Sequence, residues 1–224
     1  MSDVPVIAID GPAASGKGAV AQTVAERLKF HHLDSGAIYR AAALAIDMAG
    51  GDAGSELLAA SDAAAVASAM RLEFRGDAVW LEGQDVTLLI RSEQCGSNAS
   101  KIAVLPALRA ALLDFQRGFR RSPGLVAEGR DMASVVFPDA GLKIFLMASV
   151  AVRAERRHKQ LMEKGINANM ASLAIQIAER DERDQVRNAA PLRSQSDAVV
   201  IDSSALNLSQ VVDLVIENYL SRKN

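Results

Sequence analysis

A glycine-rich segment directly after a short apolar run constrains the fold of this chain more than any other feature. Residues 8–20 read AIDGPAASGKGAV, in which Gly11, Gly16 and Lys17 have the G-x-x-x-x-G-K spacing of a phosphate-binding loop. The preceding run at 5–10, PVIAID, is typical of a strand buried on both faces. Apolar residues then recur at every fourth position, as on one face of a helix. The sequence therefore predicts a strand, a phosphate loop and a helix in succession.

The loop is suited to a nucleoside triphosphate. Successive backbone N–H groups can surround an anion, the following helix directs its positive end toward it, and Lys17 can reach the β- and γ-phosphates. The Ser or Thr that usually follows the lysine is missing, so we expect magnesium to be held mainly by phosphates and water. The predicted ATP-binding residues of the loop are Gly11, Pro12, Ala13, Ala14, Ser15, Gly16, Lys17, Gly18 and Ala19.

The rest of the chain alternates between strand and helix patterns. Apolar runs at 124–131, 142–149 and 198–204 predict further buried strands, and helical patterns separate them. Such alternation implies a parallel sheet with helices on both faces. Residues 70–86 differ, because apolar and polar residues alternate around a Gly-Asp turn at Gly76, which predicts an antiparallel hairpin. We expect this hairpin to belong to an inserted substrate-binding lobe.

Composition excludes several classes of protein. With 224 residues and a formal charge of −2, the chain lacks the positive field of a general nucleic-acid binder. The single Cys95 cannot form an intrachain disulfide and favours a reducing compartment. No basic leader region opens the sequence, and no apolar run approaches the roughly 18 residues of a membrane span. A soluble cytoplasmic protein is expected.

Clustered arginines point to the acceptor chemistry. They gather at 117–130, 153–157 and 180–193, and a planar guanidinium can grip phosphate oxygens in pairs. An alcohol acceptor would need a carboxylate base, whereas a phosphate acceptor is already ionised and needs its charge neutralised. The three histidines, at 31, 32 and 158, lack metal-ligand spacing and are expected to be structural or superficial. The arginine candidates are Arg40, Arg130, Arg153, Arg157, Arg180 and Arg187.

Five dispersed segments together resemble the bacterial cytidylate kinase family over nearly the whole chain. They read IAIDGPAASGKG, LDSGAIYRA, NASKIAVLPALRAALLDFQ, EGRDMASVVFPDA and ERDERDQVRNAAPL. The resemblance implies an α/β, three-layer P-loop kinase fold with a five-stranded parallel sheet, an inserted monophosphate-binding lobe containing a small antiparallel sheet, and a helical lid. It also implies transfer of the ATP γ-phosphate to CMP or dCMP with Mg²⁺.

The same resemblance implies an organisation for the chain. The core would comprise about 1–37, 98–150 and 186–224, the inserted lobe about 38–97, and the lid about 151–185. The implied partners are ATP, CMP and dCMP, with no nucleic acid and no membrane. A monomer is expected.

Residue roles can be transferred at the positions that match the family. Ser35, Arg40 and Arg130 match contacts to the acceptor phosphate, where they would neutralise its oxyanions. Arg180, Asp184 and Arg187 match positions that engage the nucleoside and phosphates after closure, and their spacing of four and three places them on one helical face. The implied catalytic residues are Lys17, Arg130, Arg157 and Arg187.

The cytosine-binding positions of the family match Ser100, Arg109 and Asp131. A carboxylate can accept a hydrogen bond from the exocyclic amine of cytosine and an arginine can donate to its N3 or O2, a pairing that uracil would disturb. Because an unpaired buried polar group is costly, such a site can reject UMP. Arg157 matches a lid arginine beside ATP, as do Arg153 and Arg156. Glu128 is expected to assist Mg²⁺ through water, so no protein metal ligand is predicted.

Two departures and two alternatives accompany this interpretation. Ala19 stands where many nucleoside monophosphate kinases carry Thr, and Ala133 and Ser134 stand where Gly and Thr are common. A kinase of the same fold for an alcohol such as shikimate or gluconate is one alternative, although it would not need the 70–86 hairpin. A nucleotide-regulated switch is the other, although no N-K-x-D guanine-specifying stretch occurs in the chain.

Overall fold

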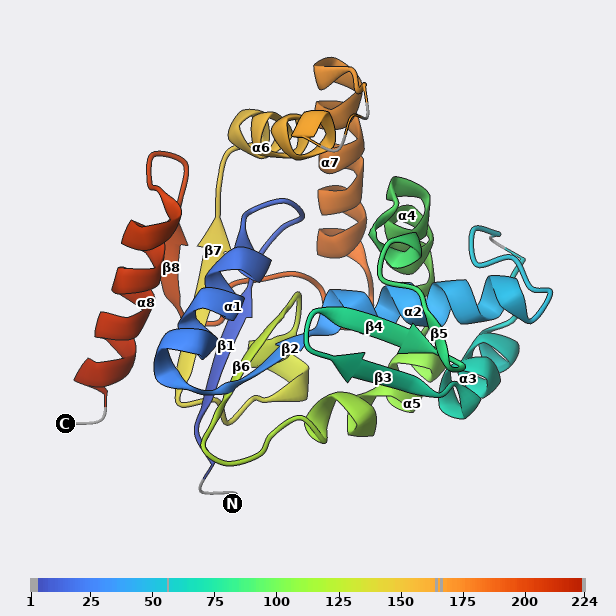
Figure 1. The fold of residues 1–224 in the computed structure, drawn as a ribbon, viewed down its shortest axis with the longest axis horizontal. Helices are drawn as coiled ribbons and strands as arrows, with labels where there is room; N and C mark the ends of the chain where they lie inside the picture. Colours follow the sequence, from blue (N-terminus) through green and yellow to red (C-terminus); the bar gives the residue numbers. More distant parts are fainter. Residues whose placement is uncertain (1–3, 56, 164, 166, 223–224) are drawn as a thin grey trace. The chain divides into compact units, whose positions relative to one another are not determined.

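The computed structural model describes residues 4–55, 57–163, 165 and 167–222. The chain forms two compact units, which are considered separately (Figure 1). The first comprises the chain up to Leu33 and from Phe119 onward, and the second runs from Asp34 to Gly118. None of the helices in the described residues combines the length and apolar character needed to cross a lipid bilayer.

A five-stranded sheet organises the first unit and confirms the predicted fold class. Its strands follow the order β2-β6-β1-β7-β8, and β1 pairs in parallel with both β6 and β7. The glycine loop therefore leaves the central strand, with the end of β6 beside it. The strand bounds are β1 Val6–Asp10, β2 His31–Asp34, β6 Leu125–Gly129, β7 Leu142–Met147 and β8 Val199–Asp202.

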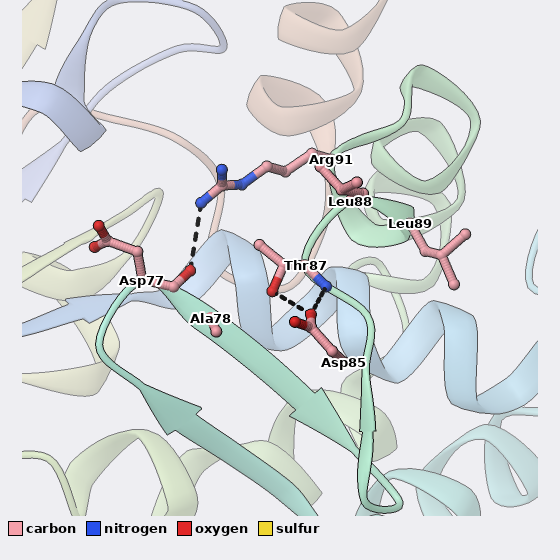
Figure 2. Close-up of a pocket in the computed structure, with 7 residues that line it drawn as sticks. All are labelled: Asp77, Ala78, Asp85, Thr87, Leu88, Leu89 and Arg91. Atoms are coloured by element: carbon pink, nitrogen blue, oxygen red, sulfur yellow. Dashed lines mark hydrogen bonds between the residues drawn. The ribbon is translucent and has the colours of Figure 1, made fainter.

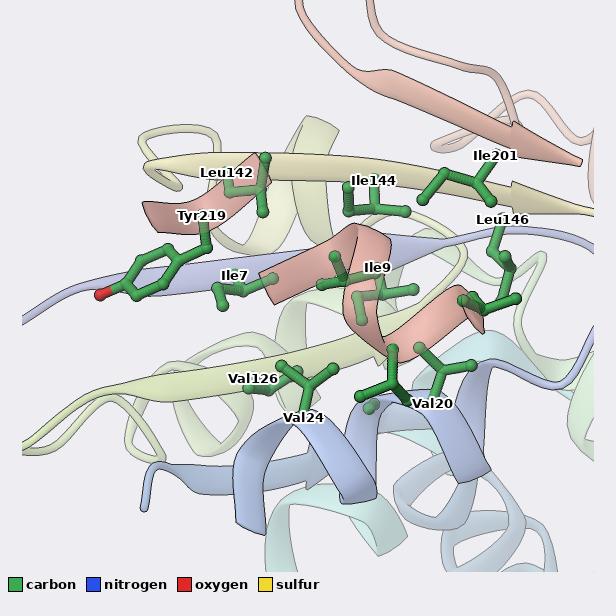
Figure 3. Packing of buried hydrophobic residues seen from close by; sticks show 14 of the residues in the cluster. Ile7, Ile9, Val20, Val24, Val126, Leu142, Ile144, Leu146, Ile201 and Tyr219 are labelled. Atoms are coloured by element: carbon green, nitrogen blue, oxygen red, sulfur yellow. The ribbon is translucent and has the colours of Figure 1, made fainter. Parts of the chain in front are cut away.

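Helices cover the sheet of this unit, and the hydrophobic core lies between them and the strands (Figure 3). Ile7 and Ile9 of β1 pack with Val20 and Val24 of the first helix, which confirms the apolar stripe predicted there. Because the core fixes both β1 and this helix, it also fixes the ends of the loop that joins them. The helices are α1 Lys17–Leu28, α6 Val150–Glu163, α7 Met170–Val186 and α8 Leu208–Ser221, with a π-helical turn at Met132–Val136.

The second unit contains the predicted hairpin and the helices around it. Strands β3 and β4 pair antiparallel on either side of a turn in which Gly76 has a φ of 60°. A short third strand, β5, extends this sheet and was not predicted. Pro106 opens α5 at its first turn, as expected. The elements are α2 Ser35–Met48, α3 Ala60–Ala69, β3 Leu72–Arg75, β4 Ala78–Leu81, β5 Gln84–Asp85, a 3-10 turn at Leu89–Arg91, α4 Glu93–Ile102 and α5 Pro106–Arg117.

The second unit is larger than the lobe expected at 38–97. Helix α4 packs against α2, and α5 packs against α3, so these four helices form one compact body with the small sheet. Helices α6 and α7, which cover most of the expected lid, pack against each other within the first unit. The division into core, lobe and lid stays a prediction.

Candidate active site

The loop between β1 and α1 has the glycine requirements of a phosphate loop. A Cβ atom at Gly11 would lie 2.0 Å from the carbonyl oxygen of Leu146, so only glycine fits this close approach of β7. Gly16 has a φ of 93° and begins α1, where its carbonyl accepts a hydrogen bond from the amide of Val20. The loop therefore brings its amides to the start of a helix, the arrangement that binds anions.

Lys17 is buried beside the loop. Its side chain is 5% exposed, and Nζ donates a 2.9 Å hydrogen bond to the carbonyl oxygen of Pro12. Burial lowers the pKa of Lys17 to about 7, and the nearby Arg130 guanidinium contributes to the decrease, whereas Glu128 and Asp10 oppose it. A phosphate group bound here would favour the charged ammonium.

Ser15 gives a further indication that the loop binds an oxygen-rich anion. Its side chain is 1% exposed, and Oγ has no hydrogen-bond partner within the described part of the chain. A buried hydroxyl without a partner is costly in a folded protein and is commonly satisfied by a ligand. A phosphate oxygen in the loop would be a suitable acceptor.

The missing hydroxyl after Lys17 has a steric explanation. A Cβ atom at Gly18 would lie 3.0 Å from Oε1 of Glu128, closer than most real Cβ contacts. Glu128 is itself buried on β6, the strand next to β1. The carboxylate therefore borders the space that a Ser or Thr side chain at this position would need.

Two arginines of α6 donate hydrogen bonds to backbone carbonyls of the loop. Arg153 is buried, donates to the carbonyl of Ala13 at 3.0 Å and forms a 2.6 Å ion pair with Asp181 of α7. Arg156 donates to the carbonyl of Ser15 at 3.2 Å. Sequence reasoning assigned both residues to the neighbourhood of ATP but missed these contacts, which tie α6 and α7 to the loop.

The other predicted ATP contacts are more exposed. Arg157 is half-buried on α6 and donates a hydrogen bond to Oε1 of Gln160 at 3.2 Å. Ala19 is exposed on the first turn of α1. A side chain at either position can therefore move or be replaced without disturbing the core.

Arg130 and Asp184, both predicted acceptor residues, form an ion pair of 2.8 Å between Nε and Oδ2. Burial alone would raise the pKa of Asp184, but Arg130 and Arg180 outweigh it and hold this pKa below its usual value. Arg187 is buried at the end of α7 and donates to the carbonyl of Ala190 at 2.6 Å. This arrangement connects β6 to the arginine-bearing face of α7.

Asp10, at the end of β1, was not singled out in the sequence. It is 3% exposed, and its two carboxylate oxygens accept hydrogen bonds from the amides of Met132 and Ala133 at 2.9 and 2.8 Å. The detectable signal was an acidic residue at the end of an otherwise apolar strand, directly before the loop. Asp131, the predicted cytosine contact, precedes these two amides and is buried.

The second unit positions two predicted phosphate contacts. Ser35 begins α2, is buried, and accepts a 2.9 Å hydrogen bond from Nε2 of Gln116. Arg40 donates to the carbonyls of Ile90 and Ser92 at 2.8 and 3.1 Å. Its guanidinium lies over Gly96, where a Cβ would be only 2.8 Å from Nη2. Glycine on α4 therefore makes room for this arginine.

The two predicted cytosine contacts of this unit lie on α4 and α5. The guanidinium of Arg109 lies 5.9 Å from the ring centroid of Tyr39, within cation–π range, and donates to the carbonyl of Ala103 at 3.4 Å. Ser100 is buried on α4. The role of these two residues in binding cytosine stays a prediction.

A hollow of about 590 Å³ lies on the small sheet of the second unit (Figure 2). Asp85 accepts hydrogen bonds from both the amide and the hydroxyl of Thr87, so this carboxylate is already engaged. The four predicted acceptor residues of this unit do not line the hollow. The lining residues are Asp77, Ala78, Asp85, Thr87, Leu88, Leu89 and Arg91.

Comparisons with known proteins identify the family of this chain. The family profile described as Cytidylate kinase matches residues 7–221. A cytidylate kinase of Nitrosomonas europaea is 51% identical over 97% of this chain and 96% of its own length. The cytidylate kinase of Cupriavidus necator is 54% identical over 97% of this chain and 96% of its own length.

Among solved structures, an uncharacterized protein from Eubacterium ventriosum is similar in fold alone. Its TM-score is 0.50 at 13% identity, over 97% of this chain and 99% of that one. The sequence relatives are far more specific, since they are about half identical over nearly the full length. The chain belongs to the cytidylate kinase family.

Proposed function

We propose that this protein transfers the γ-phosphate of ATP to CMP or dCMP, giving ADP and CDP or dCDP. The observation that carries the proposal is the phosphate loop with its buried Lys17, in a chain about half identical to cytidylate kinases. Phosphoryl transfer of this kind needs positioning and charge neutralisation more than acid–base chemistry. The buried and half-buried arginines described above would supply positively charged hydrogen-bond donors for the phosphates.

On the donor side, residues 11–19 would surround the ATP phosphates with backbone amides. Lys17 would bridge the β- and γ-phosphates, and the Oγ of Ser15 would gain a phosphate acceptor. Arg157 would contact ATP from the lid, because it is half-buried and can turn away from Gln160. Arg153 and Arg156 would keep the loop in shape through its carbonyls.

On the acceptor side, Ser35, Arg40 and Arg130 would bind the phosphate of CMP. These groups would offset the repulsion between two negatively charged phosphates. Arg180, Asp184 and Arg187 would join them when the lid, at about 151–185, closes over the lobe. Closure would exclude water and limit hydrolysis of ATP.

Recognition of cytosine would depend on Ser100, Arg109 and Asp131. The carboxylate of Asp131 would accept from the exocyclic amine, and Arg109 would donate to the base. Uracil presents a carbonyl where cytosine has the amine, so the carboxylate would face a second acceptor. We also propose that the protein works as a monomer in the cytoplasm, where the unpaired thiol of Cys95 is stable.

Magnesium would neutralise charge on the ATP phosphates. Glu128 fits this ion, because a buried carboxylate beside the loop supplies the oxygen chemistry that Mg²⁺ prefers. Gly18 leaves room for that carboxylate. Glu128 would hold the water shell of the ion, while the ATP phosphates would provide the direct ligands.

A substrate panel tests the function. ADP release would be followed with ATP and Mg²⁺ in the presence of CMP, dCMP, UMP, AMP, shikimate or gluconate. We expect turnover with CMP and dCMP and much less with the others. Faster turnover with shikimate or gluconate would support a kinase with an alcohol acceptor instead, and tight nucleotide binding with only slow hydrolysis would support a switch.

Replacing Gly18 by alanine is expected to lower kcat by about tenfold, because the added Cβ would push the Glu128 carboxylate out of place. The shorter Glu128→Asp side chain should relieve this contact. We therefore expect the fold-loss in kcat of the double variant Gly18→Ala/Glu128→Asp to be smaller than the product of the fold-losses of the two single variants. Gly141→Ala is the control, because its Cβ would meet nothing closer than 3.9 Å. Strictly multiplicative losses would contradict the steric explanation.

ATP binding is expected to take up a proton. Since burial lowers the pKa of Lys17 from 10.5 to about 7, the amine is mostly neutral in the free protein at pH 8. Phosphates favour the ammonium, so the pKa rises on binding and affinity falls as pH increases above about 7. Calorimetry at pH 8 with a non-hydrolysable ATP analogue, in buffers of different ionisation enthalpy, measures the uptake. Heat independent of the buffer would contradict this expectation.

A further inference from the structure

Asp10 adjoins both the loop assigned to ATP and the segment that carries Arg130 and Asp131. It is the last residue of β1, and Gly11, the first residue of the ATP loop, follows it directly. On the neighbouring strand β6, Asp10 is in register with Gly129. The chain continues from there into Arg130 and Asp131, which are assigned above to the phosphate and the base of CMP.

The carboxylate of Asp10 fixes this second segment through its backbone. One oxygen accepts from the amide of Met132 at 2.9 Å and the other from the amide of Ala133 at 2.8 Å. These amides open the π-helical turn Met132–Val136, and the first amides of a helical turn have no partner within it. Asp10 is 3% exposed, so water has little access to replace it.

Only an ionised carboxylate satisfies both amides at once. An asparagine would offer one acceptor oxygen and place an NH₂ group against the other N–H. Burial raises the pKa of Asp10 to about 6, and Asp131 adds to the increase, whereas the two amides and Lys17 oppose it. With a pKa of about 6, the carboxylate is mostly ionised at neutral pH, where it can accept from both amides.

We infer that Asp10 is a positioning residue for the CMP side of the site: it holds the turn that carries Arg130 and Asp131 in the conformation that binds the acceptor. This inference rests on the proposed function. Without these two hydrogen bonds, the turn would occupy the binding conformation only part of the time. The apparent affinity for CMP would then be reduced in proportion to the fraction of molecules in that conformation. Asp10 itself would touch neither nucleotide.

The test compares Asp10→Asn with the wild type. Side-chain volume is kept, but one of the two hydrogen bonds is lost. We expect KM for CMP, and its dissociation constant from calorimetry, to rise by about tenfold, the effect of losing one charge-assisted hydrogen bond. KM for ATP should change by no more than about twofold. The amides of Met132 and Ala133 should exchange hydrogen faster, whereas those of β1 should not.

Val212→Ala serves as the control for general destabilisation. Val212 is fully buried in the core on α8, and its truncation removes packing without touching the turn. It should lower thermal stability and leave the ratio of the two KM values unchanged. If Asp10→Asn behaves like this control, or weakens ATP as much as CMP, the inference is wrong. Turnover of CMP by the wild type tests the proposed function separately, so the two failures are distinguishable.

If Asp10→Asn does not fold, the wild type still provides a test. CMP binding should slow hydrogen exchange at Met132 and Ala133 beyond the protection in the free protein, because the ligand and Asp10 stabilise the same conformation of the turn. Equal exchange with and without CMP would overturn the inference.

Discussion

Replacing Lys17 by methionine is expected to reduce kcat for phosphoryl transfer by at least about 10³-fold. The lysine would offset charge on the transferring phosphate in a site from which water is largely excluded, where one electrostatic contact has a large effect. Methionine keeps most of the side-chain volume and removes the amine. ADP release with CMP and saturating ATP measures the loss.

Lys143→Met is the matched control for this change. Lys143 is also buried in the first unit, but its amine pairs with Asp197 at 2.8 Å. Its replacement should leave kcat within about twofold of the wild type. A Lys17→Met protein that retained a tenth or more of wild-type kcat would contradict the assigned role.

The same variant should alter the pH dependence of stability. The unfolded chain keeps the Lys17 proton up to about pH 10.5, whereas the folded protein releases it near pH 7. The unfolded state therefore binds more protons in this range, and this group makes the free energy of unfolding rise with pH between the two values. Denaturant titrations at pH 7 and 9 should show a smaller rise for Lys17→Met.

Replacing Arg130 by methionine is the second change with a large expected effect. It should lower kcat/KM for CMP by about 10² to 10³-fold, because a charged donor would be lost from the acceptor phosphate. It also leaves the Asp184 carboxylate buried without its 2.8 Å partner, so stability should fall. Thermal melts and kinetics must therefore be measured together.

A second variant separates these two effects. Arg130→Met/Asp184→Asn removes the buried carboxylate charge that has lost its Arg130 partner, so thermal stability should recover in part. Because Asp184 is itself a predicted CMP contact, kcat/KM for CMP is compared with that of Asp184→Asn alone and should be lower in the double variant. Arg120→Met is the matched control, because Arg120 is 16% exposed, against 17% for Arg130, and pairs with Asp139 at 2.6 Å. It should destabilise the protein without a selective loss for CMP. Activity that recovered along with stability would show that Arg130 acts only on the fold.

Local sequence patterns predicted the elements of this fold. The apolar run at 5–10 became β1, and the hairpin at 70–86 became β3 and β4, since periodicity reports which face of an element is buried. The third strand, β5, has only two residues and was missed because so short a segment carries no periodicity. The second unit includes α4 and α5 through helix packing, which the sequence does not show.

The predicted site was less complete than the predicted fold. The spacing of Gly11, Gly16 and Lys17 specified the loop, because its chemistry depends on consecutive residues. The contacts of Arg153 with Ala13 and of Asp10 with Met132 join residues more than a hundred positions apart. No local pattern reports such pairs.

The sequence alone determined that this protein has a phosphate loop on a strand, an antiparallel hairpin and a set of arginines suited to a phosphate acceptor. These features depend on neighbours along the chain. Only the tertiary structure showed that the carboxylate of Glu128, on β6, would lie 3.0 Å from a side chain at Gly18 of α1. It also decided which carboxylate tethers the Arg130–Asp131 turn. Both depend on strand order, because parallel strands distant in sequence bring their carboxyl ends together at one edge of the sheet.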